Sequence, residues 1–151
     1  MMEQIYPAVG FYFLVELDKQ AYSFKEVSGI STEITTEEIT EGGENRFKYK
    51  VPTGVKYNNL ELKRGLVAKN SDLFVWINNT LSLGLDKHIK TKDLEISLLN
   101  EQGTKIMSWN FVKAWPVGWN SSALNAMNND VVIESVSFSY NYFTTKIVTQ
   151  P

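Results

Sequence analysis

The sequence contains no cysteine, and only one histidine occurs among its 151 residues. Without cysteine the chain cannot form a disulfide framework, a thiolate metal site or a thiol nucleophile. The single histidine, His88, stands near Lys87 and Lys90, and such a histidine is most commonly solvated. Metal-ligand spacings, nucleophile elbows, phosphate-binding glycine loops and dinucleotide fingerprints are all missing from the sequence. We therefore predict no catalytic residue, no metal site and no cofactor, and we expect that the protein is not an enzyme.

Strong net charge and long apolar runs are also missing. The chain has 15 basic and 17 acidic residues and a formal net charge of -2, so no overall field attracts nucleic acid or an anionic membrane. No apolar run approaches the roughly 20 residues that a membrane-spanning helix needs. Residues 1–9 lack the basic and apolar regions of a secretory signal. We expect no membrane partner, no sequence-specific nucleic acid and no signal peptide.

What the sequence does contain is an ordinary globular composition with a dominant alternation of apolar and polar residues. Hydrophobic residues make up 43% and charged residues 21%, which is enough to form a core. Repeats, low-complexity tracts and linkers are not visible, so residues 1–151 are predicted to form a single domain. Many alternating segments and one helical segment predict a mainly β fold, an antiparallel sandwich or barrel with one packed α-helix.

The expected elements follow from the alternation and from the turn residues that interrupt it. The predicted strands are 11–17, 24–27, 33–40, 46–51, 57–63, 94–99, 105–115 and 131–143, with a helix from 71 to 81. Pro52 and Pro116 are taken to end strands. Ser71 or Asn70 is the expected helix cap. Trp76 is placed on the flank of the apolar stripe of the helix.

The hairpin between residues 33 and 51 carries unusual charge. Its first arm and turn are acidic, its second arm is basic, and pairing the arms sets acids opposite bases. One reading is a solvated hairpin held by ion pairs between its strands. The other is a protruding arm that docks on a neighbouring molecule, favoured slightly because two strands alone cannot bury Phe47 and Tyr49. The candidate interface residues are Glu37, Glu38, Glu41, Gly42, Gly43, Glu44, Asn45, Arg46, Phe47, Lys48 and Lys50.

The closing strand has one apolar and one small polar face. Val132, Val136, Phe138, Tyr140 and Tyr142 are expected on the apolar face. A run of small polar residues suits plain solvent exposure and equally suits the wall of a wet channel. The polar set, a candidate lumen or inter-subunit face, is Ser135, Ser137, Ser139 and Asn141.

Aromatic residues gather in one stretch and leave a second function open. Trp109, Phe111 and Trp115 fall on one strand face, and Trp119 follows shortly after. A carbohydrate-binding β-sandwich displays such rings on its surface to stack on sugars. In a domain of this size, however, aromatic residues on one strand face more often belong to the core.

Five segments in the same order resemble the phage T4-type tail tube protein family, the inner tube proteins of contractile phage tails and contractile injection systems. They are YPAVGFYF at 6–13, FKEVSGI at 24–30, EGGENRF at 41–47, YNNLELKRG at 57–65 and SWNFV at 108–112. Together they extend over nearly the whole chain.

The resemblance implies a structural subunit of an inner tube. Members form hexameric rings that stack into a conduit and share an inner β-barrel, with the arm near residues 41–47 joining subunits. The implied partners are further copies of the chain, sheath proteins, baseplate or spike proteins, and cargo or an effector in the lumen. The chain would be a repeating tube subunit or a tube-initiator ring. It would assemble in the bacterial cytoplasm, as part of a phage tail or of an extracellular or cell-anchored injection particle.

Overall fold

Strands dominate the computed structural model, which describes residues 12–40, 49–82, 88–121 and 130–148. In chain order the elements are β1 (Tyr12–Leu17), β2 (Gln20–Ser28), β3 (Thr32–Ile39), β4 (Tyr49–Tyr57), β5 (Leu60–Ala68), α1 (Asp72–Ser82), β6 (Lys92–Leu99), β7 (Lys105–Ser121), β8 (Asp130–Ser139) and β9 (Tyr142–Ile147). The strand pairings are antiparallel. The predicted mainly β class with a helix is therefore confirmed.

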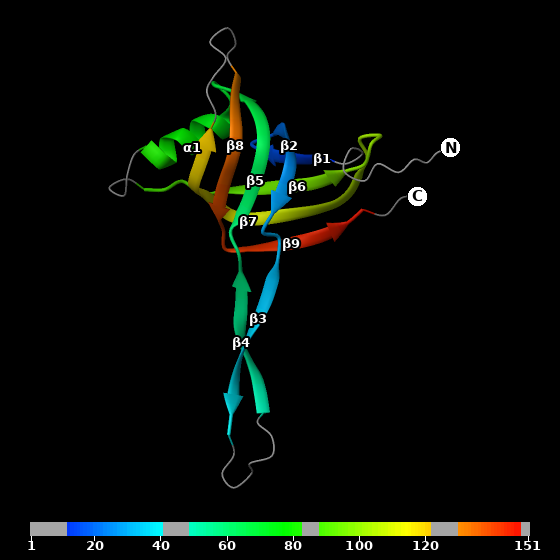
Figure 1. Ribbon diagram of the computed structural model, residues 1–151, viewed down its shortest axis with the longest axis vertical. Coiled ribbons are helices and arrows are strands. Elements are labelled where there is room, and N and C mark those ends of the chain that lie inside the picture. The colour runs from blue at the N-terminus through cyan, green and yellow to red at the C-terminus, as the bar shows by residue number, and fades with distance from the viewer. Residues whose placement is uncertain (1–11, 41–48, 83–87, 122–129, 149–151) are drawn as a thin grey trace.

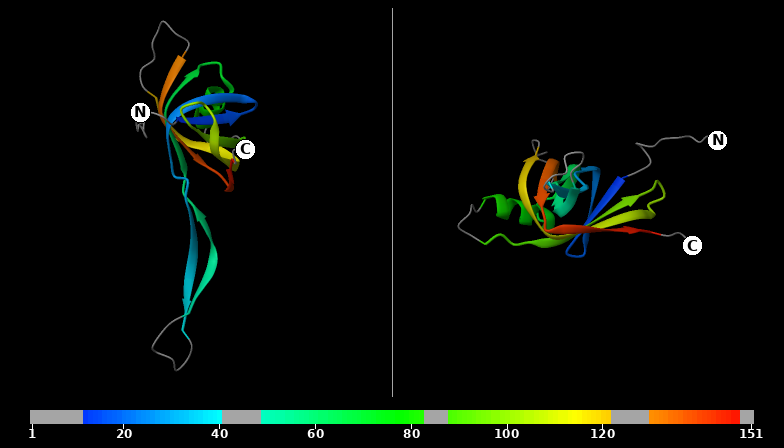
Figure 2. Two further views of the ribbon diagram at one scale, coloured as in Figure 1. Left: turned by 90° about the vertical axis from the view of Figure 1, so that its right-hand side faces the viewer. Right: turned by 90° about the horizontal axis from the view of Figure 1, so that it is seen from below.

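Six strands form a closed barrel, from which two further strands extend as an arm (Figures 1 and 2). Around the barrel the order is β6, β1, β2, β5, β8 and β7, and β6 pairs again with β7 to close the circle. β9 lengthens one wall by pairing with β7. β3 and β4 pair with each other in a separate sheet. The arm leaves the barrel where β2 ends and β5 begins.

Alternating apolar side chains fill the interior of the barrel. In β5, for example, Leu60 and Leu62 are fully buried while the residues between and beside them are not. Every strand of the barrel contributes in this way, because successive side chains of a strand point to opposite faces. The fully buried side chains of largest volume are Phe24, Phe111, Phe138, Leu17, Leu60, Leu62, Leu73, Ile77, Leu94, Ile96, Ile133 and Val15.

Helix α1 packs against β5 and β7 and buries one face in the core. It begins as predicted: the backbone N–H of Phe74 donates to the Ser71 hydroxyl oxygen at 3.2 Å, which is an N-cap hydrogen bond. Trp76 is only 5% exposed and stacks on Phe138 with ring centroids 5.6 Å apart. The expected flank position of Trp76 is therefore wrong, and this residue belongs to the core. Its indole N–H can be buried because it donates to the Lys90 carbonyl oxygen at 2.8 Å.

Both prolines expected to end strands lie inside them. β4 runs through Pro52 and β7 runs through Pro116. The strand register shifts next to each proline, so each lies at a β-bulge, where a residue without an N–H is tolerated. The predicted strand 24–27 also begins earlier, because Asp18 and Lys19 adopt positive φ angles of 50° and 68° and form a tight two-residue turn.

The predicted closing strand 131–143 is interrupted at Tyr140 and Asn141. β8 ends at Ser139 and β9 begins at Tyr142, yet both pair with the same strand, β8 along residues 115–121 of β7 and β9 along residues 107–112. The alternation also changes phase within β8, where Val131 and Ile133 are buried in place of the expected Val132. A register shift opposite this point allows the change.

Candidate assembly interface

The arm consists of β3 and β4, and most of its surface faces solvent. Every residue of β3 is exposed, and in β4 only Val51 and Tyr57 are partly covered. Eight residues of β3 span about 26 Å at roughly 3.3 Å per residue, so the ribbon extends well away from the barrel. A two-stranded ribbon of this kind has no core of its own and is marginally stable alone.

Acidic and basic residues of the arm lie opposite one another, as the sequence predicted. Glu38 pairs in register with Lys50, and Glu33 with Lys56, while Glu37 lies opposite Val51. Opposite charges across two strands contribute roughly 0.2–1 kcal/mol per pair. Of the eleven candidate interface residues, Glu37, Glu38 and Lys50 are located in this way. Those outside the described residues are Glu41, Gly42, Gly43, Glu44, Asn45, Arg46, Phe47 and Lys48.

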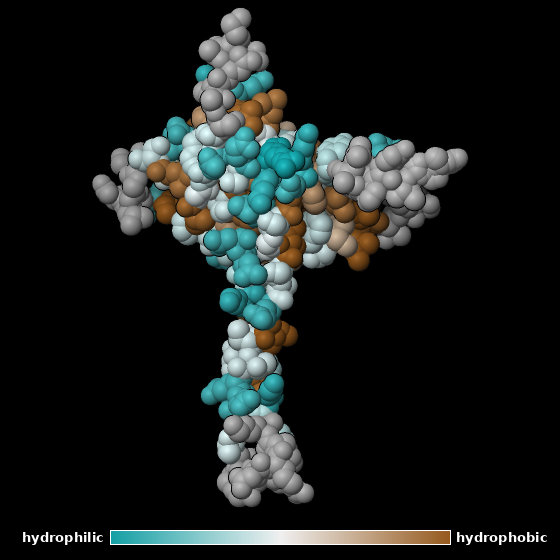
Figure 3. Space-filling view, in the orientation of Figure 1, coloured by the Kyte–Doolittle hydropathy of each residue, from teal (hydrophilic) through white to brown (hydrophobic). Residues whose placement is uncertain are grey.

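Apolar side chains of the arm also lie opposite one another, and they are largely exposed. Ile34 lies opposite Val55, and the two are 63% and 55% exposed. Ile39 lies opposite Tyr49, and these are 46% and 48% exposed. Figure 3 shows hydrophobic colour on the arm between hydrophilic residues. Ile34 and Val55 were not among the predicted interface residues, although apolar residues that alternate with charges in a two-stranded element indicate such a surface.

At its root the arm is fixed by a close approach between two backbone segments. Gly29 has a φ of +89°, and a Cβ atom there would lie 2.0 Å from the Asn59 carbonyl oxygen. Glycine is therefore required at this position. Beside this approach, the Asn58 side-chain amide donates to the Ser31 hydroxyl oxygen at 2.7 Å. The two strands thus leave the barrel from a closely packed base.

An aromatic cluster connects this base to the bend between β8 and β9. The Tyr57 ring meets those of Tyr140 and Phe143 edge-on, with centroids 5.8 Å and 5.5 Å apart. Tyr140 also contacts the ring of Phe111, at 4.9 Å between centroids. Burial raises the pKa of the Tyr140 hydroxyl above its usual value, and the neighbouring Tyr57 adds to the rise. The direction of the arm is therefore coupled to the barrel through packed rings.

The small polar residues of β8 lie on the outer face of the barrel wall. Ser135 and Ser137 are partly exposed and pair with Lys63 and Glu61 of β5. Ser139 continues the same face, which is therefore polar across two neighbouring strands. Asn141 lies outside β8, at the bend, where its backbone N–H donates to the Val112 carbonyl oxygen at 2.9 Å.

The aromatic residues considered for sugar stacking are engaged in packing. Phe111 is fully buried, and Trp109, Trp115 and Trp119 are partly buried against the same core. The Trp119 ring meets that of Phe74 edge-on at 5.4 Å between centroids. Side chains that pack in this way do not form a flat exposed platform.

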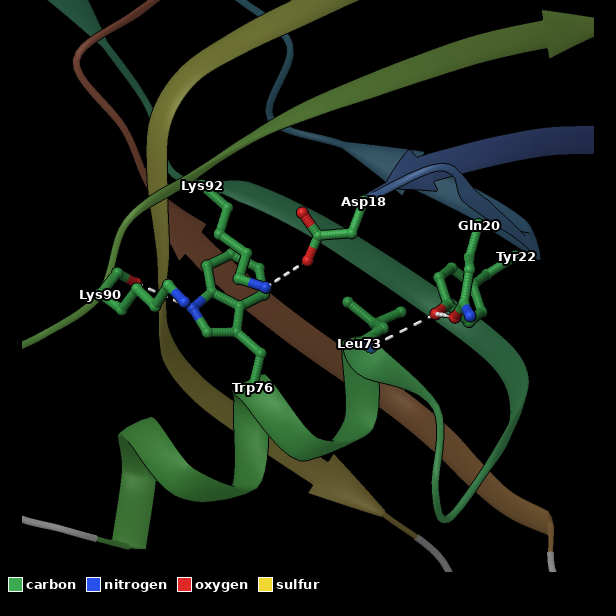
Figure 4. Close-up of polar contacts among 7 residues, drawn as sticks. All are labelled: Asp18, Gln20, Tyr22, Leu73, Trp76, Lys90 and Lys92. Carbon is green, nitrogen blue, oxygen red and sulfur yellow. Dashed lines mark hydrogen bonds and ion pairs between the residues drawn. The ribbon is translucent and has the colours of Figure 1, made fainter.

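A hollow of about 340 Å³ beside α1 includes His88 in its lining. Lys92 forms an ion pair there with Asp18, and its amine lies 5.8 Å from the centroid of the Trp76 ring (Figure 4). Asp18 and Lys92 of this hollow are thus engaged with each other. In the described parts of the chain, no group of histidine, aspartate and glutamate side chains could hold a metal ion. Nor does any described helix have the length and apolarity to cross a membrane.

Comparisons with solved structures find the same fold in contractile injection systems. The chain is similar to one in the sheath-tube complex of the extracellular contractile injection system PVC in its extended state, with 29% identity over 90% of this chain and 88% of that one and a TM-score of 0.69. A chain of the PVC sheath/tube terminator is 28% identical, with 97% and 99% covered and a TM-score of 0.69. A chain of the tube-terminating cap of the anti-feeding prophage is 26% identical, with 98% and 96% covered and a TM-score of 0.70.

A search of curated proteins gives no significant match. The family model of the T4-like virus tail tube protein gp19, in contrast, matches residues 9–144. This match spans most of the chain and includes the arm and the whole barrel. The resemblance inferred from the five sequence segments is confirmed, and the carbohydrate-binding alternative gains no support. The chain belongs to the T4-like virus tail tube protein family.

Proposed function

We propose that this chain, acting as a single domain over residues 1–151, is a structural subunit of the tube of a contractile injection system or phage tail. Subunits form hexameric rings that share an inner barrel, and the rings stack into a conduit for cargo. The role is structural and requires no catalysis. The observation that carries the proposal is the exposed arm, on which the facing side chains of Ile34 and Val55 are 63% and 55% exposed.

Docking of the arm on a neighbouring copy provides the contact that the assembly needs. Fully burying an aliphatic side chain contributes roughly 1.5–3 kcal/mol, so covering Ile34 and Val55 supplies a substantial part of one contact. The facing charges of the arm then set the register of docking, because a shifted arm would place like charges together. Residues 41–48 belong to the same proposed interface.

The polar face of β8 is the surface that we assign to the lumen or to a contact between subunits. Ser135, Ser137 and Ser139 are small and uncharged, and a channel wall of such residues offers little for a passing cargo to adhere to. Asn141, at the bend, extends this face toward β9. Sheath proteins and baseplate or spike proteins are the proposed outer and terminal partners, an assignment supported by the similar chain in a sheath-tube complex. The particle would assemble in the bacterial cytoplasm, and the chain would serve as a tube subunit or as its first ring.

The test is a double substitution, Ile34→Thr with Val55→Thr, which keeps β-forming residues and removes exposed apolar surface. We expect rings or rods in negative-stain microscopy to fall at least about tenfold in yield, while urea unfolding of the subunit stays unchanged. Val117→Thr is the matched control, because Val117 is also an exposed valine in a strand but lies on the barrel. Purified protein that remains monomeric at high concentration would contradict the proposed function. Normal rods from the double variant would contradict the docking of the arm.

A further inference from the structure

A groove opens in the barrel wall where β2 and β5 separate. The two strands pair between residues 24 and 28 of β2, and Phe24 with Gly65 is the last pair. Beyond it, residues 20–23 of β2 pair with β1 on their other side, and residues 66–68 of β5 pair with β8. Within the described residues, the edges that face each other across the gap have no strand between them. The groove between them has a volume of about 950 Å³.

Local geometry builds this separation into the sheet. The Phe24 ring lies against Gly65, where a Cβ atom would come within 2.3 Å of a ring carbon. Directly before this glycine, Arg64 adopts a φ of 62°, which bends β5 at the point where the strands diverge. Tyr22, on the β2 side, is held in place by accepting a hydrogen bond from the Leu73 backbone N–H at 3.3 Å (Figure 4). The groove is thus a fixed feature of the barrel.

The chemistry of the groove suits a strand that carries both acidic and apolar side chains. Lys25 and Arg64 line it, and since the Arg64 guanidinium pairs with the Glu26 carboxylate at 3.5 Å, Lys25 carries most of the positive charge that the groove offers. Leu66, also in the lining, is 59% exposed. The open strand edges on both sides can pair with an extended backbone, as happens when a peptide adds a strand to a sheet.

Strand β3 of the arm has this character. It carries Glu33, Glu37 and Glu38, has no lysine or arginine, and also presents Ile34 and Ile39. β3 pairs with β4 along one edge, and in the described structure its other edge is unpaired. Glu33 and Glu38 face lysines of β4, whereas Glu37 faces Val51 and can meet the positive charge of the groove. The one open edge of β3 can pair with one of the two open edges there.

The arm and the groove lie at opposite ends of the same two strands. The arm connects the end of β2 with the start of β5, while the groove lies between the start of β2 and the end of β5. Figures 1 and 2 show the arm pointing away from the barrel, so it cannot reach the groove of its own subunit. Two unlike surfaces at opposite ends make a heterologous contact, which repeats along one direction.

We propose that the groove between β2 and β5 receives strand β3 from the arm of a second copy of this chain. This inference rests on the proposed function and identifies the receiving surface that the arm docks on. Lys25 attracts Glu37 of the arriving strand, Leu66 covers one of its isoleucines, and its open backbone edge pairs with one edge of the groove. Successive copies then stack head to tail along the axis of β2 and β5.

Cysteine cross-linking tests the contact directly, because the natural chain contains no cysteine. A variant with Thr36→Cys in the arm and Ser23→Cys at the groove is assembled and oxidised. We expect a ladder of dimers, trimers and longer multimers on a non-reducing gel, since each copy offers both partners. Thr36→Cys with Lys113→Cys, on a strand that does not line the groove, should give no species above a dimer. Rods that form normally without a ladder, whether Ser23→Cys or Ala21→Cys is used, would overturn the inference.

Charge exchange separates the failure of this inference from that of the proposed function. Lys25→Glu should lower rod yield at least about tenfold with unfolding unchanged, and Glu37→Lys in the same chain should restore much of it. Lys113→Glu is the control for the change in net charge. If Ile34→Thr with Val55→Thr abolishes rods while Lys25→Glu leaves them intact, the arm docks elsewhere and the proposed function stands. If none of these variants affects assembly, the arm is not the contact, and both this inference and the proposed docking of the arm fail while the tube function stands.

Discussion

The Tyr140 hydroxyl donates a hydrogen bond of 2.6 Å to the carbonyl oxygen of Asn58. These residues are 82 positions apart in the chain, and their bond joins the bend between β8 and β9 to the base of the arm. Since Tyr57 next to Asn58 also packs on the Tyr140 ring, a polar and an apolar contact act at the same point. The orientation of the arm is therefore determined by the barrel and not by the arm itself.

Tyr140→Phe tests this connection. It keeps the ring in the aromatic cluster and removes the hydroxyl, so we expect the free energy of unfolding to fall by about 1 kcal/mol. Amide hydrogen exchange at residues 56–60 should accelerate, because the base of the arm loses a contact, while exchange in β6 stays the same. Tyr142→Phe is the matched control. Unchanged exchange at the base of the arm in Tyr140→Phe would contradict the proposed coupling.

Gly29→Ala is expected to displace the arm without unfolding the barrel. Its Cβ atom would collide with the Asn59 carbonyl oxygen, and its positive φ is unfavourable for alanine. We expect a loss of about 1–3 kcal/mol of stability and a marked loss of rods by microscopy. Gly54→Ala provides the comparison within the arm, since a Cβ there makes an ordinary contact of 3.5 Å with the Thr35 hydroxyl oxygen. Equal behaviour of the two variants would show that the close approach at Gly29 has no special role.

Gly65→Ala should destabilise the barrel itself. The added methyl group would overlap the Phe24 ring, and forcing extra volume into a packed core costs about 1–3 kcal/mol. Phe24→Leu combined with Gly65→Ala should cost less than the sum of the single changes, because the smaller side chain relieves the overlap. Gly118→Ala is the control, as a Cβ there meets nothing within 4 Å. The measurement is urea unfolding, and strictly additive single and double effects would rule out the overlap.

Alkaline pH should weaken the contact of Tyr140 with the arm base. The pKa of Tyr140 is raised by burial and then by Tyr57, so the folded state favours the protonated hydroxyl. The pKa of Tyr140 in the folded state lies above the unfolded value near 10. The stabilisation that the protonated hydroxyl gives the folded state is therefore complete below about pH 10 and is lost as pH rises through the folded pKa. Subtracting the ultraviolet titration of Tyr140→Phe from that of the natural chain should reveal one tyrosine with a midpoint above 10. A midpoint at or below that value would contradict this assignment.

Local patterns predicted the features that depend on neighbouring residues. The alternation of charges in the hairpin gave the opposition of Glu38 and Lys50, and Ser71 was recognised as a cap from its position before an apolar stripe. Both features arise from contacts within a hairpin or a single helical turn. The five segments resembling a known family then supplied the barrel architecture and the tube function, which the alternation alone left open.

Features that depend on residues far apart in the sequence could not be predicted in this way. Proline usually ends a strand, but β-bulges in the pairing with the neighbouring strand accommodate Pro52 and Pro116. Trp76 became a core residue because Lys90, in a later segment, accepts its indole N–H. The groove between β2 and β5 could not be predicted either. It forms where the two strands stop pairing, and only the register of both strands shows that point.

A polymer that joins arms to grooves has polarity, because the two surfaces lie at opposite poles of each molecule. One terminus of such a polymer shows vacant grooves and the other shows unattached arms. A factor that seeds growth at one terminus therefore cannot also halt elongation at the other. Each task requires its own complementary surface, so the direction of the filament is already encoded in a single subunit.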